Sequence, residues 1–206
     1  MGGKYINDMN IEDLIIKQIN DSVSVKTKVL ADEALRDKIK QAALFLVDAY
    51  KSCRKVLLAG NGGSAADAQH LAGEFVSRFY FDRPGLPAIA LTTDTSIMTA
   101  IGNDYGFDRL FERQAQAQGV PGDVFLGIST SGNSENIIRA LQYCRQAGIR
   151  TIGLTGFGGG RMKEWCDICI EVPSSETPRI QEAHILVGHI LCCIVEEKLF
   201  GTTLSD

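Results

Sequence analysis

Between Ile11 and Tyr50 the apolar residues recur at helical spacing and form two stripes. The first stripe consists of Ile11, Ile15, Ile19 and Val23, and the second consists of Leu35, Ile39, Ala42 and Leu46. A repeat of three to four residues places apolar side chains on one face of a helix. The pattern therefore predicts two helices, with a break near Ala31 and Asp32.

After Lys55 the pattern changes to short apolar runs that alternate with helical segments. The runs cover residues 56–59, 88–91, 124–128, 151–154 and 168–172. This alternation is typical of βαβ units, in which helices cover both faces of a parallel sheet. We therefore predict an α/β fold with a doubly wound, five-stranded parallel sheet flanked by helices. N-terminal helices over residues 1–54 would precede a single domain over 55–206, which a helix from about 179 to 199 would close.

The composition is that of an ordinary folded chain, with 206 residues, 45% hydrophobic and 22% charged positions, and a net charge of -4. The acidic balance and the lack of a basic run disfavour binding to nucleic acid. The first five residues lack the apolar core of a secretory signal, and no run of 18 apolar residues occurs. We therefore expect a cytoplasmic protein that does not associate with membranes.

Six cysteines are present, and in a reducing compartment buried free thiols are the usual state. Cys166 and Cys169 have the spacing of a metal or redox pair. A zinc knuckle requires a second such pair, which the chain lacks. We therefore interpret these two cysteines as part of an apolar strand.

Three of the predicted strands end in small or hydroxylated residues that precede a helix. These segments cover residues 60–64, 129–134 and 155–160. Open α/β sheets bind ligands at the carboxyl ends of their strands, near the point where the strand order reverses. We therefore expect a ligand site where these segments meet.

The segment 129–134 reads Ser-Thr-Ser-Gly-Asn-Ser and opens a predicted helix at Glu135. Free amides and the positive end of the dipole at a helix N-terminus favour a phosphate, and the hydroxyl groups add donors. A simple helix cap is the alternative, but a cap needs one such residue and this segment has four hydroxyls and a glycine. We favour a phosphate monoester site. The Gly-Lys-Ser/Thr ending of a P-loop is absent, which disfavours nucleotide hydrolysis.

The first segment, Gly60-Asn61-Gly62-Gly63-Ser64, does not meet the GxGxxG spacing of a dinucleotide site, but its glycines allow close approach to a ligand. On the helix that follows, His70 and Glu74 are four residues apart and share a face. A histidine and a carboxylate in this relation can bind a metal or act as an acid-base pair. Surface pairs without function have the same spacing.

The last predicted helix carries Gln181, His184 and His189 in an otherwise apolar run. At about 100° per residue, Gln181 lies about 60° from His184 and about 80° from His189. The two histidines are about 140° apart, so they are not expected to face one site. Spacing alone slightly favours His184 as the partner of Gln181, and a buried core histidine is the alternative for either residue.

Taken together, these motifs resemble the sugar isomerase (SIS) domain family, and within it the bacterial phosphoheptose isomerases. The resemblance extends from about Leu57 to Glu196 and rests on residues 60–70, 100–104, 129–134 and 179–184. Such enzymes convert sedoheptulose 7-phosphate into D-glycero-D-manno-heptose 7-phosphate, the first step toward the ADP- and GDP-heptoses of bacterial surface polysaccharides such as lipopolysaccharide.

Carried over residue by residue, the resemblance implies that Glu74 and His189 are the catalytic pair. It implies one zinc ion per subunit, held by His70, Glu74, Gln181 and His189. It implies that the substrate contacts Asn61, Gly62, Gly63, Asn103, Asp104, Ser129, Thr130, Ser131, Ser134 and Gln181. Members of this family are homotetramers with sites shared between subunits, so the apolar stripes of the first helices could serve assembly or pack on their own domain.

Two non-enzymatic classes share this fold. One relative binds the bacterial replication initiator and lacks the carboxylate at the Glu74 position and the histidine at the His189 position, both of which are present here. The other class consists of sugar-phosphate-sensing transcription regulators, which need a DNA-binding domain. The segment before the first predicted strand resembles the isomerases' own helices instead.

Overall fold

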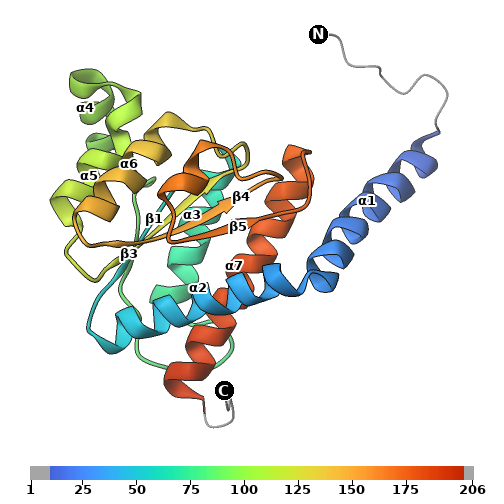
Figure 1. Ribbon diagram of the computed structural model, residues 1–206, viewed down its shortest axis with the longest axis horizontal. Helices are drawn as coiled ribbons and strands as arrows, with labels where there is room; N and C mark the ends of the chain where they lie inside the picture. Colours follow the sequence, from blue (N-terminus) through green and yellow to red (C-terminus); the bar gives the residue numbers. More distant parts are fainter. Residues whose placement is uncertain (1–9, 202–206) are drawn as a thin grey trace.

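The computed structural model describes residues 10–201 (Figure 1). The first five residues, on which the expectation about a secretory signal rests, lie outside this range. Within it the strands are β1 (Val56–Gly60), β2 (Ala88–Ala90), β3 (Val124–Ser129), β4 (Arg150–Thr155) and β5 (Ile168–Glu171). All five predicted strands are confirmed, with ends that differ by one residue.

The sheet is parallel throughout, and its strand order is β2-β1-β3-β4-β5. Leu58 of β1 pairs with Leu126 of β3, which in turn pairs with Ile152 of β4. The chain direction across the sheet reverses between β1 and β3. In this strand order that position is the topological switch point, where ligands bind. The segments after β1 and β3 are two of the three that the sequence analysis singled out.

The helices are α1 (Ile11–Ala31), α2 (Glu33–Lys51), α3 (Gly63–Val76), α4 (Thr95–Tyr105), α5 (Leu110–Gln118), α6 (Glu135–Gln146) and α7 (Thr177–Phe200). Two short 3-10 helices cover Phe107–Arg109 and Arg161–Trp165. The predicted break lies at Asp32, whose extended backbone ends α1 and whose carboxylate accepts a hydrogen bond from Leu35 N at 2.9 Å. No helix in the described part of the chain has the length and apolar character needed to cross a membrane.

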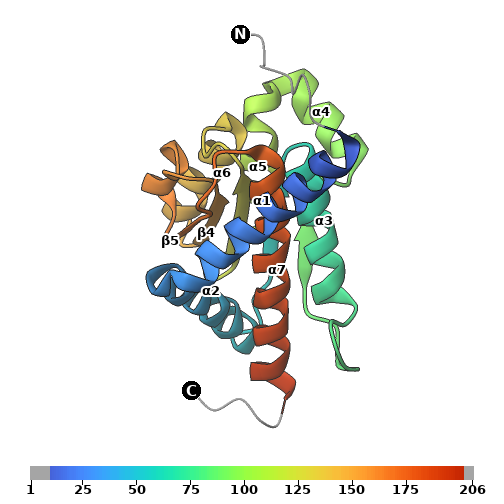
Figure 2. The ribbon, with the colours of Figure 1, turned by 90° about the vertical axis from the view of Figure 1, so that its right-hand side faces the viewer.

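Helices cover both faces of the sheet (Figures 1 and 2). Alternate residues of each strand point to opposite faces. Val56 and Leu58 of β1 accordingly pack with α2, α3 and α7, whereas Leu57 and Ala59 pack with α5 and α6. Because both faces are covered, all residues of β1 and β3 are buried, which explains why these strands read as continuous apolar runs.

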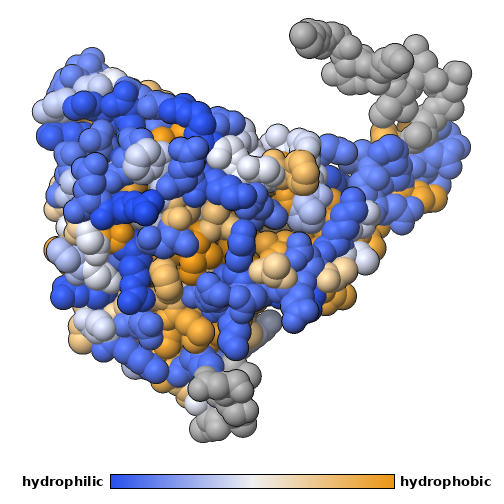
Figure 3. Space-filling model, viewed as in Figure 1, coloured by the Kyte–Doolittle hydropathy of each residue, from blue (hydrophilic) through white to orange (hydrophobic). Residues whose placement is uncertain are grey.

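The two N-terminal helices have different surroundings. The stripe of α2, from Leu35 to Leu46, is buried against the sheet and α7. Helix α1 extends away from the sheet (Figure 1), and apolar side chains are visible along it in Figure 3. Its exposed apolar residues include Ile11, Ile15, Ile16, Ile19, Val23 and Leu30. The first stripe therefore does not pack on its own domain, whereas the second does.

Candidate active site

Three of the predicted site residues meet between α3 and α7. The Nε2 atoms of His70 and His189 are 2.8 Å apart, and His70 Nε2 lies 3.4 Å from Glu74 Oε1. One donor atom from each of the three residues lies within 4.8 Å of the others. The structure thus brings together His70 and Glu74, which share a face of α3, with a histidine that is 119 positions away in sequence.

The close approach of the two helices depends on Gly188. Helices α3 and α7 lie side by side (Figure 2). A Cβ atom at Gly188 would lie 2.6 Å from Leu71 Cδ2, which is closer than side chains approach one another. Because Gly188 precedes His189 and Leu71 follows His70, this close contact lies directly beside the two imidazoles. The glycine in the apolar run of α7 is therefore part of the site.

The cluster opens into a cleft of about 730 Å³. Its walls are formed by Ala66, Gln69, His70, Gly73, Glu74, Ser77, Arg78 and Phe79. The ring of Phe79 packs 5.5 Å from that of His189, centroid to centroid. The side chains of His70 and Glu74 are 46% and 24% exposed, so a ligand in the cleft can reach them.

Two imidazole nitrogens and one carboxylate oxygen are the donor set of many catalytic zinc sites, which keep a further position open for water or substrate. Tetrahedral zinc with bonds of about 2.0–2.1 Å holds its donor atoms roughly 3.3 Å apart. The separations of 2.8 and 3.4 Å are near this value, so small side-chain rotations would suffice. The chemistry and spacing of His70, Glu74 and His189 fit a divalent metal ion.

Gln181 lies at another part of α7. It precedes His189 by eight residues, which corresponds to about 12 Å along the helix axis. Its amide lies against the segment after β1, because a Cβ atom built on Gly63 would be 2.3 Å from Gln181 Nε2. Gln181 therefore borders the loops at the sheet edge, and its place among the metal ligands stays a prediction.

The predicted phosphate loop, residues 129–134, lies between β3 and α6. Ser134 is the N-cap residue of α6, yet its side chain makes no capping hydrogen bond. The Ser134 hydroxyl instead lies 2.9 Å from that of Ser129. Side chains cap α1, α2 and α4, whereas α3, α5 and α7 also begin without a side-chain cap. The first-turn amides of α6 are therefore not occupied by a side chain, which favours an anion site over the simple cap.

A neighbouring glycine-rich loop supports the phosphate loop. The carbonyl of Gly132 accepts a hydrogen bond from Met162 N at 2.9 Å, and the side-chain oxygen of Asn133 accepts one from Arg161 N at 3.0 Å. Gly132 itself has a φ of +66°, which favours glycine. The segment after β4 thus forms one wall of this loop, at the edge of the sheet where the sequence analysis placed a ligand.

The segment after β1 is joined to the phosphate loop by a pair of amides. Asn61 and Asn136 exchange two hydrogen bonds, each 2.9 Å long, between their side chains. Asn136 is buried in the first turn of α6. Gly62 follows with a φ of +57° and starts α3 without a side-chain cap. The loops after β1 and β3 are thereby held at a fixed distance across the switch point.

Asn103 and Asp104 lie near the end of α4, where both side chains are exposed. Asn103 Nδ2 donates to Asp104 Oδ1 at 2.8 Å. Within residues 10–201, neither side chain forms a hydrogen bond or ion pair with the cluster. Their role in binding the sugar stays a prediction.

Comparison with known proteins assigns the chain to a family. A family model described as SIS domain matches residues 19–156. A phosphoheptose isomerase from Campylobacter jejuni is 65% identical over 196 residues, which cover 95% of this chain and 98% of that protein. This chain belongs to the phosphoheptose isomerases of the SIS domain family. It is accordingly a sugar phosphate isomerase.

Two further relatives agree with this assignment. A phosphoheptose isomerase from Aneurinibacillus thermoaerophilus is 63% identical over 190 residues, which cover 92% of this chain and 96% of that protein. The solved structure of the phosphoheptose isomerase from Neisseria gonorrhoeae has a TM-score of 0.86 at 40% identity, and the match covers 91% of this chain and all of that one. The SIS fold expected from the motifs is confirmed.

The isomerase uses its two α7 histidines differently. His184, which spacing alone slightly favoured as the partner of Gln181, is 1% exposed and lies in the interior. Burial lowers its pKa from 6.5 to about 4, against a smaller opposing effect of the Thr155 backbone. His184 is therefore the core histidine that the sequence analysis held open as an alternative, and His189 is the one beside His70.

Because buried His184 is neutral, we predict that the free energy of unfolding depends on pH. Its folded pKa is depressed, so the unfolded chain binds more protons between pH 6.5 and 4, and stability falls as the pH falls through this window. The full shift corresponds to about 3 kcal/mol. We expect urea unfolding between pH 7 and 4.5 to show a smaller loss of stability in His184→Leu than in wild type. Parallel losses in the two proteins would contradict this assignment.

Four residues near the isomerase site had not been identified from the sequence: Phe79, Arg83, Asn136 and Glu196. Glu196 offered one signal, because it follows His189 by seven residues and so lies near the same face of the last helix. Asn136 lies one residue past the start of α6, where a capping role is the usual interpretation. Phe79 and Arg83 lie in a segment without periodicity.

Proposed function

We propose that this isomerase converts sedoheptulose 7-phosphate into D-glycero-D-manno-heptose 7-phosphate through an enediol intermediate. The observation that carries the proposal is the cluster of His70, Glu74 and His189, of which His70 and Glu74 form part of the wall of an open cleft. The uncapped helix N-terminus after β3 supports a phosphorylated substrate. The name phosphoheptose isomerase, which its relatives bear, supports the seven-carbon sugar.

Moving the carbonyl group from C2 to C1 requires two proton transfers. One group takes a proton from C1 and returns it to C2, and a second group moves protons between the two oxygens. Glu74 and His189 are the proposed pair, because their donor atoms lie within 4.8 Å of each other and both are partly exposed. The Nε2 atoms of His70 and His189 are 2.8 Å apart, so the His189 ring faces the side chains of α3.

We propose that His70, Glu74 and His189 also hold a zinc ion, with Gln181 as the fourth residue implied by the family. When bound, zinc polarises a carbonyl and stabilises negative charge on an enediolate oxygen. The cluster supports this assignment through its donor set. The remaining polar groups of the site would bind the sugar and its phosphate.

The phosphate of the substrate is proposed to bind Ser129, Thr130, Ser131 and Ser134 together with the first amides of α6. Dipole and free amides at this N-terminus favour an anion without requiring a nearby positive side chain. Asn61, Gly62, Gly63 and Gln181 would contact the sugar between the phosphate loop and the cluster. Their position at the β1 side of the switch point supports this.

We further propose that the enzyme is a homotetramer. The exposed apolar stripe of α1, from Ile11 to Leu30, supports an assembly surface, because monomers rarely expose such a patch. Asn103 and Asp104, exposed at the end of α4, could then complete a site in a neighbouring subunit. The reaction would be the first step toward the heptoses of bacterial lipopolysaccharide and related polysaccharides.

A role as a non-catalytic protein that binds the replication initiator is the alternative from the sequence analysis. That class lacks a carboxylate at the Glu74 position and a histidine at the His189 position. Here both side chains lie beside His70, next to a cleft that Glu74 lines, an arrangement that a scaffold does not need. The observations therefore favour an enzyme.

Incubating the purified enzyme with sedoheptulose 7-phosphate should yield the aldose product, which can be followed by anion-exchange chromatography. We expect a chelator to lower the rate at least about tenfold, since a bound metal supplies several kcal/mol of transition-state stabilisation. Adding zinc back should restore it. Absence of turnover by a well-folded protein would contradict the proposed reaction, and full activity after verified metal removal would contradict the metal.

A further inference from the structure

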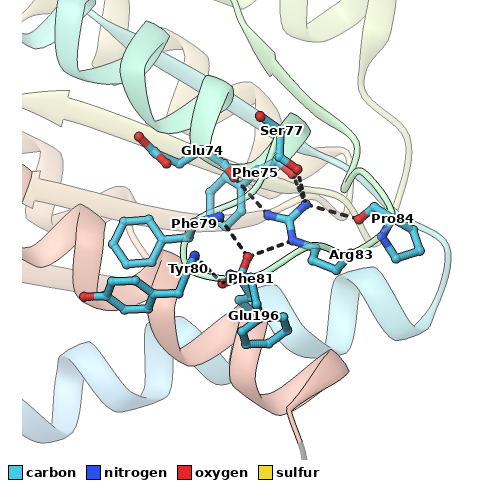
Figure 4. A network of polar contacts seen from close by, with 9 residues as sticks. All are labelled: Glu74, Phe75, Ser77, Phe79, Tyr80, Phe81, Arg83, Pro84 and Glu196. Carbon is cyan, nitrogen blue, oxygen red and sulfur yellow. Dashed lines mark hydrogen bonds and ion pairs between the residues drawn. The ribbon is translucent and has the colours of Figure 1, made fainter.

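A short segment of chain beside the cleft is held by one buried carboxylate. This segment, residues 77–83, is here called the strap. Glu196 of α7 is 1% exposed. Its carboxylate accepts hydrogen bonds from the backbone amides of Phe79, Tyr80 and Phe81, at 2.8, 2.6 and 3.3 Å (Figure 4). It also accepts one from Arg83 Nε at 3.0 Å. Such a set of donors favours the ionised form of a carboxylate.

Arg83 extends this network to the last turn of α3. Its guanidinium donates to the backbone carbonyls of Glu74 at 2.9 Å and Phe75 at 2.6 Å, and to that of Ser77 at 3.1 Å (Figure 4). The last carbonyls of a helix lack partners within the helix, so Arg83 satisfies them. One buried ion pair therefore joins α7, the strap and the turn of α3 that bears Glu74.

The same network places Phe79 against the cluster. Phe79 N donates to Glu196, and its ring lies 5.5 Å from the His189 ring while forming part of the cleft wall. Glu196 follows His189 by seven residues, two turns along a similar face of α7. The carboxylate thus fixes the strap relative to the helix that carries His189.

The charge of Glu196 is consistent with this arrangement. Burial alone would raise the pKa of Glu196, but the three amides and Arg83 outweigh that effect and hold it below its usual value. Truncating one partner of a buried pair leaves the other without compensation. A change at Glu196 is therefore expected to release both the strap and the end of α3.

We propose that Glu196 and Arg83 are positioning residues of the isomerase. They hold the strap so that Phe79 packs on His189, and they hold the last turn of α3 so that Glu74 faces the same point. This inference rests on the proposed function, because it assigns Glu74 and His189 the proton transfers. If the two residues served stability alone, their replacement would destabilise the fold without changing the geometry of the cluster.

The chain offers a matched control in Asp123. Its side chain is fully buried and accepts hydrogen bonds from the backbone amides of Lys55 and Val120 at 3.0 and 2.9 Å, and from Lys55 Nζ at 2.7 Å. Asp123 and Lys55 precede β3 and β1, so they lie at the amino edge of the sheet, opposite the loops of the site. Asp123→Asn thus disturbs a similar network far from the cleft.

We would compare Glu196→Gln, Phe79→Leu and Asp123→Asn with wild type, using kcat and KM for sedoheptulose 7-phosphate. We expect kcat to fall about tenfold or more in the first two variants, because small displacements of catalytic groups are costly, with KM within about twofold. Asp123→Asn should lose stability and keep its kcat. Equal losses of kcat in Asp123→Asn and Glu196→Gln would overturn the proposal, as would full kcat in Phe79→Leu.

Histidine signals provide a readout that does not depend on turnover. The chain has three histidines, so NMR of protein labelled at the histidine rings gives three assignable signals. We expect Glu196→Gln and Phe79→Leu to shift the His189 signal and to leave that of His184 in place. An unmoved His189 signal in both would overturn positioning. If the wild-type protein does not convert the sugar, the proposed function fails, but the histidine signals still test whether the strap positions His189. If Glu196→Gln does not fold, Phe79→Leu still provides the test.

Discussion

Replacing Glu74 with glutamine is expected to lower kcat about 10³-fold. Glutamine has the size of glutamate but cannot accept a proton, and a positioned acid-base group contributes about 10²- to 10⁴-fold to the rate. Glu74 lies 3.4 Å from His70 Nε2 at the wall of the cleft, and its backbone carbonyl is held by Arg83. The substitution should therefore remove the chemistry while leaving the last turn of α3 in place. Measurement of kcat and KM with sedoheptulose 7-phosphate checks this expectation.

Glu112→Gln is a suitable control for this experiment. The Glu112 side chain is 19% exposed, close to the 24% of Glu74, and it lies on α5, which packs on the other face of the sheet. We expect near-normal kcat in this variant. The metal content of Glu74→Gln distinguishes metal binding from proton transfer. A variant that keeps its metal but loses turnover assigns Glu74 to proton transfer. A kcat close to that of wild type would remove the carboxylate from the mechanism.

The architecture could be predicted from the sequence because both faces of the sheet are covered. Strands such as β1 and β3 are buried along their whole length, so each appears as a continuous apolar run whose short length, between helical segments, indicates a strand. The break at Asp32 was visible for a local reason, because its carboxylate caps α2. Periodicity did not show that the apolar stripe of α1 is exposed. An apolar stripe has the same spacing whether it packs on its own chain or on another chain.

The site was predicted less completely, because its geometry depends on contacts between distant segments. His70 and Glu74 share one helix face, so their proximity follows from spacing. The choice between His184 and His189 depends on which face of α7 meets α3, and the face that does so includes Gly188, which lies against Leu71. Spacing alone slightly favoured His184, which is buried, and the family resemblance indicated His189, which lies beside His70 and Glu74.

The strap was not predicted at all. Its hydrogen bonds run from backbone amides to Glu196. Every residue except proline has such an amide, so the residue types of the donors do not indicate these bonds. Arg83 and Glu196 are 113 positions apart, and each taken alone has the appearance of an ordinary surface charge. A buried ion pair between distant segments is therefore a part of the site that a single sequence does not predict.

Gly132→Ala is expected to raise KM for the phosphorylated substrate strongly and to lower kcat/KM about 10²-fold, because small misplacements of binding groups have effects of this size. Gly132 has a φ of +66°, and an added Cβ would lie 2.1 Å from the carbonyl oxygen of Gly159. The added Cβ is bonded directly to the backbone and its neighbour is a backbone oxygen, so no side-chain rotation relieves the clash and the loop must move. Its movement displaces Ser131, Ser134 and the first amides of α6, which are proposed to bind the phosphate.

Gly148→Ala separates the clash from the cost of the backbone conformation. Gly148 has a similar φ of +70°, but its nearest neighbour would be Pro121 Cβ at an ordinary 3.5 Å. It lies between α6 and β4, at the end of the sheet opposite the phosphate loop. Both variants pay about 1–2 kcal/mol for a left-handed alanine, and only Gly132→Ala should change KM. Equal KM values in the two variants would show that the serine loop does not hold the phosphate, and the uncapped α6 would then need another explanation.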